Sequence, residues 1–522
     1  MKKVFTLLVA AMSAATVMAD NYTDQLNIRI NGMEVASQEA TISIDRQDNG
    51  LYTLQLANFM LGSEMPVGNI KLTDVPASPK GDATLLAVTQ QVSIEAGSLP
   101  GVGESDYLGP MLGIIPIQLR AEFTSSQLYA FISIDLTSSL GQNILCTFGD
   151  GGYQLKNSGF EDFHTASMGS ATSDEPNAWH SFMSSTGLFA QTVGTVPHTF
   201  ISTDTRPGST GSKSVLVKSG KVLGFVIANG TITTGQLQAD AMSATDPKNC
   251  SFTDLQNKET DGNGDPFYTT FNGYPDSLAV WVKFKQEEVL PSYPYATVCA
   301  VITDGTRYQD PEDQSYTNYL AKAQHASIES NGFVWQRLSI PFVYEEDKNG
   351  TAVPDAPKAI HITVSTNAAA GQGTGSDSLL VDDIEMVYNC GLAQLSVKET
   401  PIVLEEGVYN YTVDFDGEVS VDDVHAVSSA RRNSIIKSLR AEEDAAVATI
   451  ELISNDLQTS KTYNIRLRGA SVTGIRNIAA DGEQLNDGGE LYRISGQRLN
   501  NAHQGLVIER NGKGVRKMIL TK

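Results

Sequence analysis

The sequence predicts an all-β, multidomain protein, and three observations lead to that prediction. Apolar and polar residues alternate along much of the chain, as at Leu26, Ile28 and Ile30, and a period of two gives a strand one buried face. The 45 glycines and the low share of charged residues, 19%, favour turns and strands. At roughly 150 residues per domain, a chain of 522 residues should form three to four domains.

The charge balance excludes two classes of partner. The chain has 37 Lys and Arg residues against 60 Asp and Glu residues, which gives a net charge of −23. Nucleic acids are bound through clustered Lys and Arg, and anionic membrane surfaces attract basic segments. We therefore expect no nucleic-acid partner and no attachment to anionic lipid.

The N-terminus predicts export. Lys2 and Lys3 precede an apolar run over residues 4–11, and Val17-Met18-Ala19 fits a cleavage site, so residues 1–19 are interpreted as a signal peptide. No Cys follows that site, which argues against a lipoprotein, and no later apolar run approaches the ~18 residues of a transmembrane segment. We expect a secreted or outer-cell-surface protein.

Residues 20–150 should form the first domain. About eight to ten short alternating strands, with turn residues between them, predict a closed antiparallel barrel or a sandwich. The stretches at residues 52–59 and 67–70, and above all Leu140-Gly141-Gln142-Asn143-Ile144-Leu145-Cys146-Thr147-Phe148-Gly149, resemble the calycin-like β-barrel domain of exported Bacteroidota proteins. That resemblance implies a barrel that either holds a small apolar ligand or is filled by its own side chains.

Residues 151–390 should form the second domain. Three blocks appear in order: Asn157-Ser158-Gly159-Phe160-Glu161-Asp162-Phe163, Tyr274-Pro275-Asp276-Ser277-Leu278-Ala279-Val280-Trp281-Val282-Lys283-Phe284-Lys285, and Leu379-Leu380-Val381-Asp382-Asp383-Ile384-Glu385-Met386-Val387-Tyr388. Together they resemble the PCMD carbohydrate-metabolism domain of exported Bacteroidota proteins, which is similar to jelly-roll carbohydrate-binding modules. The resemblance implies a jelly-roll β-sandwich that binds or handles a glycan or oligosaccharide.

The rest of the chain should hold a small domain and a tail. Residues 391–469 alternate again, at a length typical of an immunoglobulin-like sandwich, with a charged stretch at 434–448 that is interpreted as a helical interruption. In residues 470–522, Gly489-Glu490-Leu491-Tyr492-Arg493-Ile494-Ser495-Gly496-Gln497-Arg498-Leu499 and the ending Lys517-Met518-Ile519-Leu520-Thr521-Lys522 resemble the type IX sorting tail. That resemblance implies the export machinery as a partner.

The resemblance to carbohydrate-binding modules also implies a structural Ca²⁺. Its ligands would be the carboxylate of Glu161, one carboxylate of the Asp382 and Asp383 pair, and the carbonyl of Gly159. Strand alternation lets only one of the two aspartates point inward, and we expect Asp382. The ion would tie the ends of the domain together; the alternative is an Asp pair solvated at a strand end.

One further segment begins like a calcium loop. Asp261-Gly262-Asn263-Gly264-Asp265 has the right acidic start, but Pro266 and Asn272 stand where an EF-hand needs Gly and Glu. We interpret this segment as a plain turn.

The candidate sugar-binding residues are Tyr308, Asp310, Gln314 and Tyr316, which combine aromatic and planar polar groups in one loop-like segment. The alternative is a solvated loop whose tyrosines pack on their own strands. Trp281 and Trp335 alternate with apolar neighbours and are interpreted as core residues, and Trp179, which follows Pro176, is interpreted as a packing residue near the calcium end of the domain.

No catalytic residue is assigned. The seven histidines show no HExxH spacing, and the chain has no G-x-S-x-G elbow, P-loop or dinucleotide fingerprint. The four cysteines are far apart, so both pairing and buried free thiols stay open. The function predicted is non-catalytic glycan binding at the cell surface. The alternatives are a glycoside-hydrolase-like enzyme, which needs only two suitably spaced carboxylates, and a structural or adhesive surface protein.

Overall fold

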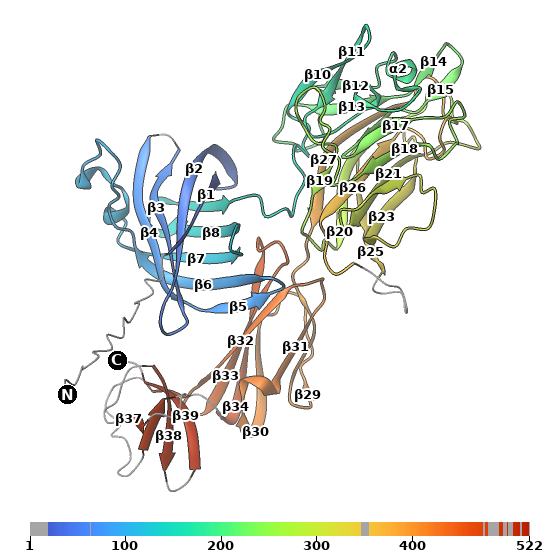
Figure 1. Cartoon of the computed structure of the whole chain (residues 1–522). Coiled ribbons are helices and arrows are strands. Elements are labelled where there is room, and N and C mark those ends of the chain that lie inside the picture. The colour runs from blue at the N-terminus through green and yellow to red at the C-terminus, as the bar shows by residue number, and fades with distance from the viewer. Residues whose placement is uncertain are drawn as a thin grey trace, which may run out of the picture.

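The computed structural model describes residues 19–345 except Ser63, residues 354–472, and five strands beyond them. All of the predicted signal peptide except Ala19 lies outside the described residues. The chain is nearly all β, as predicted (Figure 1). Its described α-helices are two single turns, α1 (Thr137–Leu140) and α2 (Ala190–Val193). No helix among the described residues is long and apolar enough to cross a membrane.

The first group of strands forms one nine-stranded antiparallel sheet in the order β4-β3-β2-β1-β9-β8-β7-β6-β5. Its strands are β1 (Asp20–Ile30), β2 (Met33–Arg46), β3 (Tyr52–Leu61), β4 (Met65–Val75), β5 (Ala77–Lys80), β6 (Ala83–Ser93), β7 (Ile114–Phe123), β8 (Leu128–Leu136) and β9 (Gln142–Phe148). β1 and β9, the first and last of these strands in the chain, pair in the middle of the sheet, with Ile28 opposite Cys146. The roll nearly closes where Asn69, on β4, and Glu95, just after β6, exchange two backbone hydrogen bonds of 2.8 and 3.3 Å.

The interior of the barrel is packed with apolar side chains. Inward-facing residues such as Leu54, Leu56, Ile117 and Ile132 are fully buried and belong to one continuous cluster. Their spacing of two is the alternation seen in the sequence, which explains why one face of each strand is buried.

The second group of strands builds two facing sheets. Their members and the hairpins around them are β10 (Phe163–Met168), β11 (Ala171–Pro176), β12 (Thr199–Ser202), β13 (Ser214–Lys218), β14 (Gly220–Val222), β15 (Val226–Ala228), β16 (Thr231–Thr233), β17 (Gln236–Ala239), β18 (Asn249–Thr253), β19 (Thr269–Thr270), β20 (Ser277–Lys285), β21 (Ala296–Thr303), β22 (Tyr308–Asp310), β23 (Tyr319–Ile328), β24 (Gln336–Pro341), β25 (Val343–Tyr344), β26 (Ala359–Ser365) and β27 (Ser378–Val387). One sheet runs β12-β13-β27-β20-β24, and the other runs β16-β26-β21-β23-β25 with β19 beside β26.

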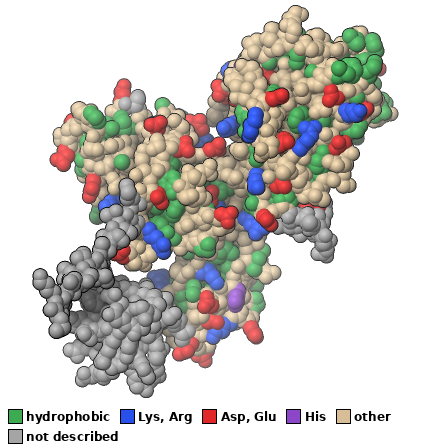
Figure 2. Space-filling model, in the orientation of Figure 1, with side chains coloured by type: hydrophobic (Ala, Val, Ile, Leu, Met, Phe, Trp, Pro, Cys, Tyr) green, Lys and Arg blue, Asp and Glu red, His purple; other side chains and the backbone are tan. Residues whose placement is uncertain are grey.

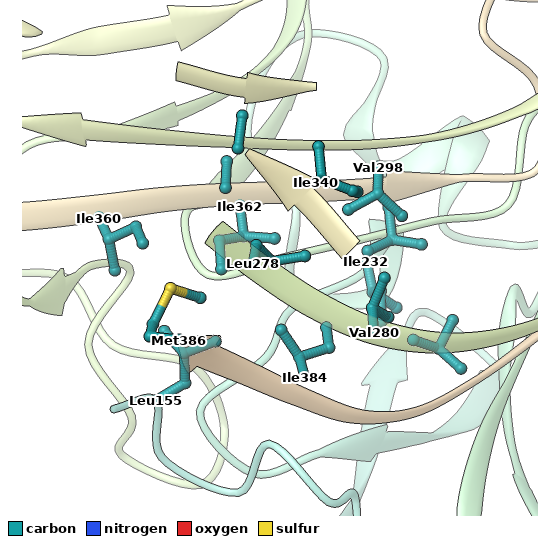
Figure 3. Packing of buried hydrophobic residues seen from close by; sticks show 14 of the residues in the cluster. Leu155, Ile232, Leu278, Val280, Val298, Ile340, Ile360, Ile362, Ile384 and Met386 are labelled. Carbon is teal, nitrogen blue, oxygen red and sulfur yellow. The ribbon is translucent and has the colours of Figure 1, made fainter. Parts of the chain in front are cut away.

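The core of this central domain lies between the two sheets. Figure 3 shows Leu278 and Val280 of β20 facing Ile360 and Ile362 of β26, with Ile384 of β27 beside them. These side chains are fully buried, and they occupy every second position of their strands. The domain is therefore a two-layer β-sandwich.

The third group of strands forms a smaller pair of sheets, in the orders β29-β28-β31 and β30-β34-β33-β32. The strands are β28 (Leu392–Val397), β29 (Thr400–Pro401), β30 (Asn410–Val419), β31 (Val424–Ser428), β32 (Ser434–Ala441), β33 (Ala445–Ile453) and β34 (Ser460–Val472). The helix expected over 434–448 was wrong, because that stretch is a β-hairpin in which Ser434 pairs with Ile453. Its charges are accommodated on the exposed face, where Arg466 of β34 forms an ion pair with Glu442.

The described part of the tail is a further five-stranded sheet in the order β35-β39-β38-β36-β37. Its strands are β35 (Arg476–Ile478), β36 (Glu490–Arg493), β37 (Arg498–Leu499), β38 (Gly505–Asn511) and β39 (Gly514–Leu520). The resemblance of the tail to a sorting domain rests partly on residues outside the described ones.

A small apolar cluster joins the barrel, the central domain and the third domain. It combines Leu85 and Tyr129 of the barrel with Ile453 and Leu457 of the third domain, and Tyr153 between barrel and sandwich lies among them. Figure 1 shows β5 and β6 of the barrel passing beside β32 and β33. The three domains therefore share buried surface.

A buried polar network reinforces this junction. The Lys80 ammonium donates to Tyr153 Oη at 2.9 Å and to the carbonyl of Asn455 at 2.6 Å, and it forms an ion pair with Glu122. Burial lowers the pKa of Lys80 against the opposing effect of Glu122. Because a buried charge is stable only when it is hydrogen-bonded and paired, these contacts fix the barrel on the third domain.

Candidate functional site

The outer face of the five-stranded sheet of the central domain has three partly exposed aromatic side chains. Trp281 of β20 is half-buried, whereas its neighbours Val280 and Val282 are fully buried in the core. The interpretation of Trp281 as a core residue was therefore wrong. It alternates with core residues because it points to the opposite face of the same strand.

Trp335 and Phe333 lie just before β24, at the edge of the same sheet, and both are half-buried. The expectation of a core position for Trp335 was also wrong, because its indole nitrogen donates to Asp204 Oδ1 at 3.0 Å near the surface. Lys283 lies 4.5 Å from the centre of the Phe333 ring and forms an ion pair with Asp204. That contact with Lys283 is the main cause of the lowered pKa of Asp204.

Arg206 connects this aromatic patch with the aspartates predicted to bind calcium. Its guanidinium carbon lies 5.7 Å from the centre of the Trp281 ring, and its Nε forms an ion pair with Asp383. Trp281 is directly opposite Asp382 across β20 and β27. We call Trp281, Phe333 and Trp335, together with Asp204, Arg206 and Lys283, the aromatic face.

Asp382 is the buried member of the aspartate pair, but it lies opposite Trp281 on the outer side of the sheet, because the alternation of β27 is interrupted between Val381 and Ile384. Its Oδ2 accepts from the backbone nitrogen of Arg206 at 2.9 Å, while its Oδ1 is buried without a hydrogen-bond partner. Burial raises the pKa of this carboxyl to about 6. An orphaned buried oxygen of this kind fits a cation ligand. Asp383 is partly exposed, and its backbone has a φ of 43°.

The turn that carries Gly159 and Glu161 lies beside these aspartates. The carbonyl of Ser158 accepts from Ile384 on β27 at 3.0 Å, and a Cβ built on Gly159 would lie 3.1 Å from Asp383 Oδ1. The start and the end of the domain therefore lie together. Beside this turn, the Trp179 ring is fully buried against Phe160, which confirms it as a packing residue.

Glu161 fits a calcium ligand less well. Its two carboxylate oxygens accept hydrogen bonds from the backbone nitrogens of Ser212 and Lys213 and from the Ser212 hydroxyl, at 2.9 to 3.0 Å. Burial acts to raise the pKa of Glu161, but these hydrogen bonds outweigh it and lower the pKa. Among the described residues, the carboxylates of Glu161, Asp382 and Asp383 do not all converge within 4.8 Å.

The predicted sugar-binding loop is largely packed on its own sheet. Tyr308 is fully buried, and its hydroxyl donates to Glu312 at 3.0 Å. Asp310 accepts from the Thr363 hydroxyl at 2.7 Å. Tyr316 is half-buried against the Tyr308 ring, while Gln314 is exposed. Of the four predicted residues, Tyr308 is therefore buried, Asp310 and Tyr316 are half-buried, and Gln314 is exposed.

A cluster that the sequence did not predict lies at the edge of the central domain. His164 of β10, Glu175 of β11 and Asp261 each point one ligand-type atom at a common centre, and these atoms lie within 4.8 Å of one another. The Nδ1 of His180 is 3.4 Å from Asp261 Oδ2. Asp261 begins the segment interpreted as a plain turn. It is a turn, since Asp261 Oδ1 accepts from the backbone nitrogens of Asn263 and Asp265.

Where the three domains meet, the described residues line an open cleft of about 1400 Å³. Its wall includes Phe123 of the barrel, Asn272 of the central domain and Ile435 of the third domain. Figure 2 shows acidic and basic side chains interspersed over the visible face rather than gathered into one basic surface. The four cysteines are buried free thiols, and burial raises the pKa of each, so they are poor nucleophiles.

Comparison with known proteins identifies the first domain. No curated protein matches the sequence. Residues 18–150 match the family described as the calycin-like beta-barrel domain, over the part of the chain that forms the nine-stranded sheet. The nearly closed barrel at the N-terminus of this chain is therefore a calycin-like β-barrel domain.

Proposed function

We propose that this chain is an exported, non-catalytic carbohydrate-binding protein of the cell surface, and that it binds its glycan on the aromatic face of the central domain. The observation that carries the proposal is the group of three half-buried aromatic rings, Trp281, Phe333 and Trp335, on the outside of one sheet. Groups of aromatic side chains that are partly exposed on a protein surface are common at binding sites.

The chemistry of the aromatic face suits a sugar. Sugars are held by aromatic rings that stack on their C–H surfaces and by a few placed polar groups that bond their hydroxyls. Asp204, Arg206 and Lys283 contact or surround the rings and offer charged donors and acceptors. The resemblance of three sequence blocks to the PCMD carbohydrate-metabolism domain supports the same function.

Glycan-array binding of the full chain, followed by titration with the best glycan, tests the proposal. We expect Trp281→Ala and Trp335→Ala each to weaken binding about tenfold or more, as truncation of a central aromatic anchor does. Tyr316→Ala and Gln314→Ala are the matched controls on the predicted loop, and they should bind like wild type. No glycan bound by the folded chain, or unchanged binding by both tryptophan variants, would overturn the proposal.

One observation favours the alternative of a glycoside hydrolase. The buried Asp382, whose pKa is raised to about 6 by burial, has the property required of a general acid. Hydrolysis of the bound glycan by wild type, abolished in Asp382→Asn, would support the enzyme. Binding without product release over many hours would support the non-catalytic protein, and failure to bind any glycan would favour a structural or adhesive role.

We also propose that a structural Ca²⁺ binds at Asp382 with carbonyl groups of the adjacent turn, because Asp382 Oδ1 is buried and has no donor. Thermal unfolding with CaCl₂ or with EGTA checks this. A melting temperature that calcium raises in wild type but not in Asp382→Asn is the expected result, and identical curves under both conditions would contradict it.

Export through the signal peptide and the tail completes the proposal. Fractionation of cells that express the chain with and without residues 470–522 checks the role of the tail. We expect the full chain at the surface and the shortened chain retained; equal surface display of both would remove the export machinery as a partner.

A further inference from the structure

We propose that His164, Glu175, His180 and Asp261 bind one divalent transition-metal ion, with zinc the best fit, at the edge of the central domain. The site is separate from the predicted calcium residues and from the aromatic face. It would hold the first hairpin of the domain against the turn that begins at Asp261.

The fold brings these residues together from four positions. His164 and Glu175 are directly opposite each other on the hairpin β10–β11. His180 is held by two backbone hydrogen bonds to Thr233 at the end of β16. Asp261 starts the turn that the bridge between Thr260 and Pro266 closes.

Three of the facing atoms lie as ligands of one ion would, because those of His164, Glu175 and Asp261 are all within 4.8 Å of one another. His164 Nε2 lies 3.6 Å from Glu175 Oε2 and 3.5 Å from Asp261 Oδ2, and His180 Nδ1 lies 3.4 Å from the same oxygen. Two ligands of a tetrahedral zinc ion, each 2.0 to 2.1 Å from the metal, are about 3.3 to 3.4 Å apart. All four facing atoms are buried and have no hydrogen-bond partner.

The two histidines are held in the tautomers that a metal requires. His180 Nε2 lies 3.2 Å from the carbonyl of Pro266, so this nitrogen is the donor and Nδ1 keeps its lone pair. His164 Nδ1 lies 3.0 Å from Asn177 Oδ1, which leaves the lone pair on Nε2. Ligating histidines in proteins commonly use the second nitrogen in this way.

Each of the two carboxylates likewise has one oxygen held by hydrogen bonds and one oxygen that faces the site. Glu175 Oε1 accepts from the backbone nitrogen of Ser181 and from the Ser184 hydroxyl, while Oε2 faces the centre. Asp261 Oδ1 accepts from two backbone nitrogens of its turn, while Oδ2 faces the centre. Each of the four side chains therefore has one polar atom fixed by its surroundings and one directed at the site.

The donor set selects the kind of metal. Two imidazole nitrogens and two carboxylate oxygens suit zinc and its first-row neighbours, whereas Ca²⁺ and Mg²⁺ prefer oxygen ligands throughout. The side chains of Glu175, His180 and Asp261 have no exposed surface, and that of His164 is 12% exposed. His164, Glu175 and Asp261 would be three of the ligands, and His180 Nδ1, which lies beside Asp261 Oδ2, would be the fourth when the ion binds. A set of four protein ligands is the arrangement of a structural rather than a catalytic zinc site.

Metal analysis of the full chain tests the proposal. After dialysis against dipicolinic acid and reloading with ZnCl₂, we expect about one zinc per chain for wild type and less than about a tenth of that for Glu175→Gln and His164→Gln. His198→Gln is the matched control, a buried histidine of the same domain outside the cluster, and it should keep one zinc. With CoCl₂, wild type should develop the strong visible absorption of tetrahedral Co²⁺.

The alternative is an ion-free cluster in which a protonated His164 bridges the two carboxylates. Stripped, folded wild type that takes up no Zn²⁺, or whose melting temperature zinc does not raise, would establish that alternative and overturn the proposal. If the ligand variants do not fold, the zinc content per chain and the Co²⁺ spectrum of wild type are sufficient to distinguish the metal site from the ion-free cluster.

Discussion

The Arg120 side chain of the barrel donates from Nη2 to the carbonyl of Gln458 in the third domain at 2.8 Å. Its other terminal nitrogen donates to the Ser460 hydroxyl at 2.6 Å. Arg120 is almost fully buried, and it also stacks over Phe131 at 4.5 Å. These contacts join two domains through residues that are 338 and 340 positions apart in the sequence.

Arg120→Ala should uncouple the barrel from the third domain. The substitution removes two charge-assisted hydrogen bonds and leaves the Gln458 carbonyl without this donor, a loss of about 3 kcal/mol. Differential scanning calorimetry should show a barrel transition at lower temperature than in wild type. Arg29→Ala is the control, because it removes an exposed ion pair with Glu34 that is worth at most about 1 kcal/mol. Superimposable traces for both variants would contradict the prediction.

Gly68→Ala should open the barrel where it nearly closes. Gly68 has a φ of 126°, and a Cβ built on it would lie 2.1 Å from the carbonyl oxygen of Glu95, so the strand end must shift. The control is Gly81→Ala, where φ is also positive at 59° but nothing lies within 4 Å. Urea denaturation followed by circular dichroism should show a loss of about 2 to 3 kcal/mol beyond that of the control. Equal losses at both positions would refute the steric explanation.

The buried His361 should make the central domain sensitive to acid. Burial lowers the pKa of His361 to about 4, against the weaker opposing effect of Asp310. In the unfolded chain this histidine has an ordinary pKa near 6.5, so below that pH it binds a proton that it does not bind in the folded chain. Above about pH 6.5 this histidine therefore does not lower the free energy of unfolding. As the pH falls toward 4, the free energy of unfolding decreases by most of roughly 3 kcal/mol.

Tryptophan fluorescence is the measurement for this prediction, because all three tryptophans belong to the central domain. The urea midpoint of wild type should fall more steeply between pH 7 and pH 4.5 than that of His361→Leu, which has no group to protonate. His425→Gln, at an exposed position, should follow wild type. Parallel pH profiles for His361→Leu and wild type would show that the histidine carries no such penalty.

Asn177→Ala should weaken metal binding without removing a ligand. Asn177 accepts from His164 Nδ1 at 3.0 Å and so orients that ring. Loss of such an outer partner commonly lowers metal affinity 10- to 100-fold. Competition with a chromophoric zinc chelator should reveal this decrease in the full chain, while Asn263→Ala, an exposed turn residue, should change affinity much less. Wild-type affinity in Asn177→Ala would argue that the ring is held by other contacts.

The strands were predictable because alternation is a local property. Residues such as Leu54 and Leu56 follow one another at the spacing of a buried face, so each strand of the barrel is visible without knowledge of its partner. The failure at 434–448 has the same origin. Charged residues there resemble a helix surface, and only the pairing of Ser438 with Thr449 reveals the hairpin.

The histidine cluster could not be found in the same way. His164, Glu175, His180 and Asp261 are separated by unequal intervals, and no short motif contains them. The one local signal is the hairpin around Gly169: once its strand register is known, His164 lies opposite Glu175. Asp261 arrives from a distant turn, and its role depends on tertiary structure alone. Trp281 was misjudged because alternation identifies two faces but not which face a neighbouring sheet covers.

The apolar cluster at the domain junction also bears on how the chain is made. The barrel sequence is complete about 300 residues before Ile453 and Leu457 emerge. At a synthesis rate of 5 to 20 residues per second, the surface around Leu85 and Tyr129 would stay exposed for roughly 15 to 60 seconds before the third domain can pack on it. A nascent chain with such a delay is exposed to misassociation. Expression of the barrel by itself would make that exposed surface permanent.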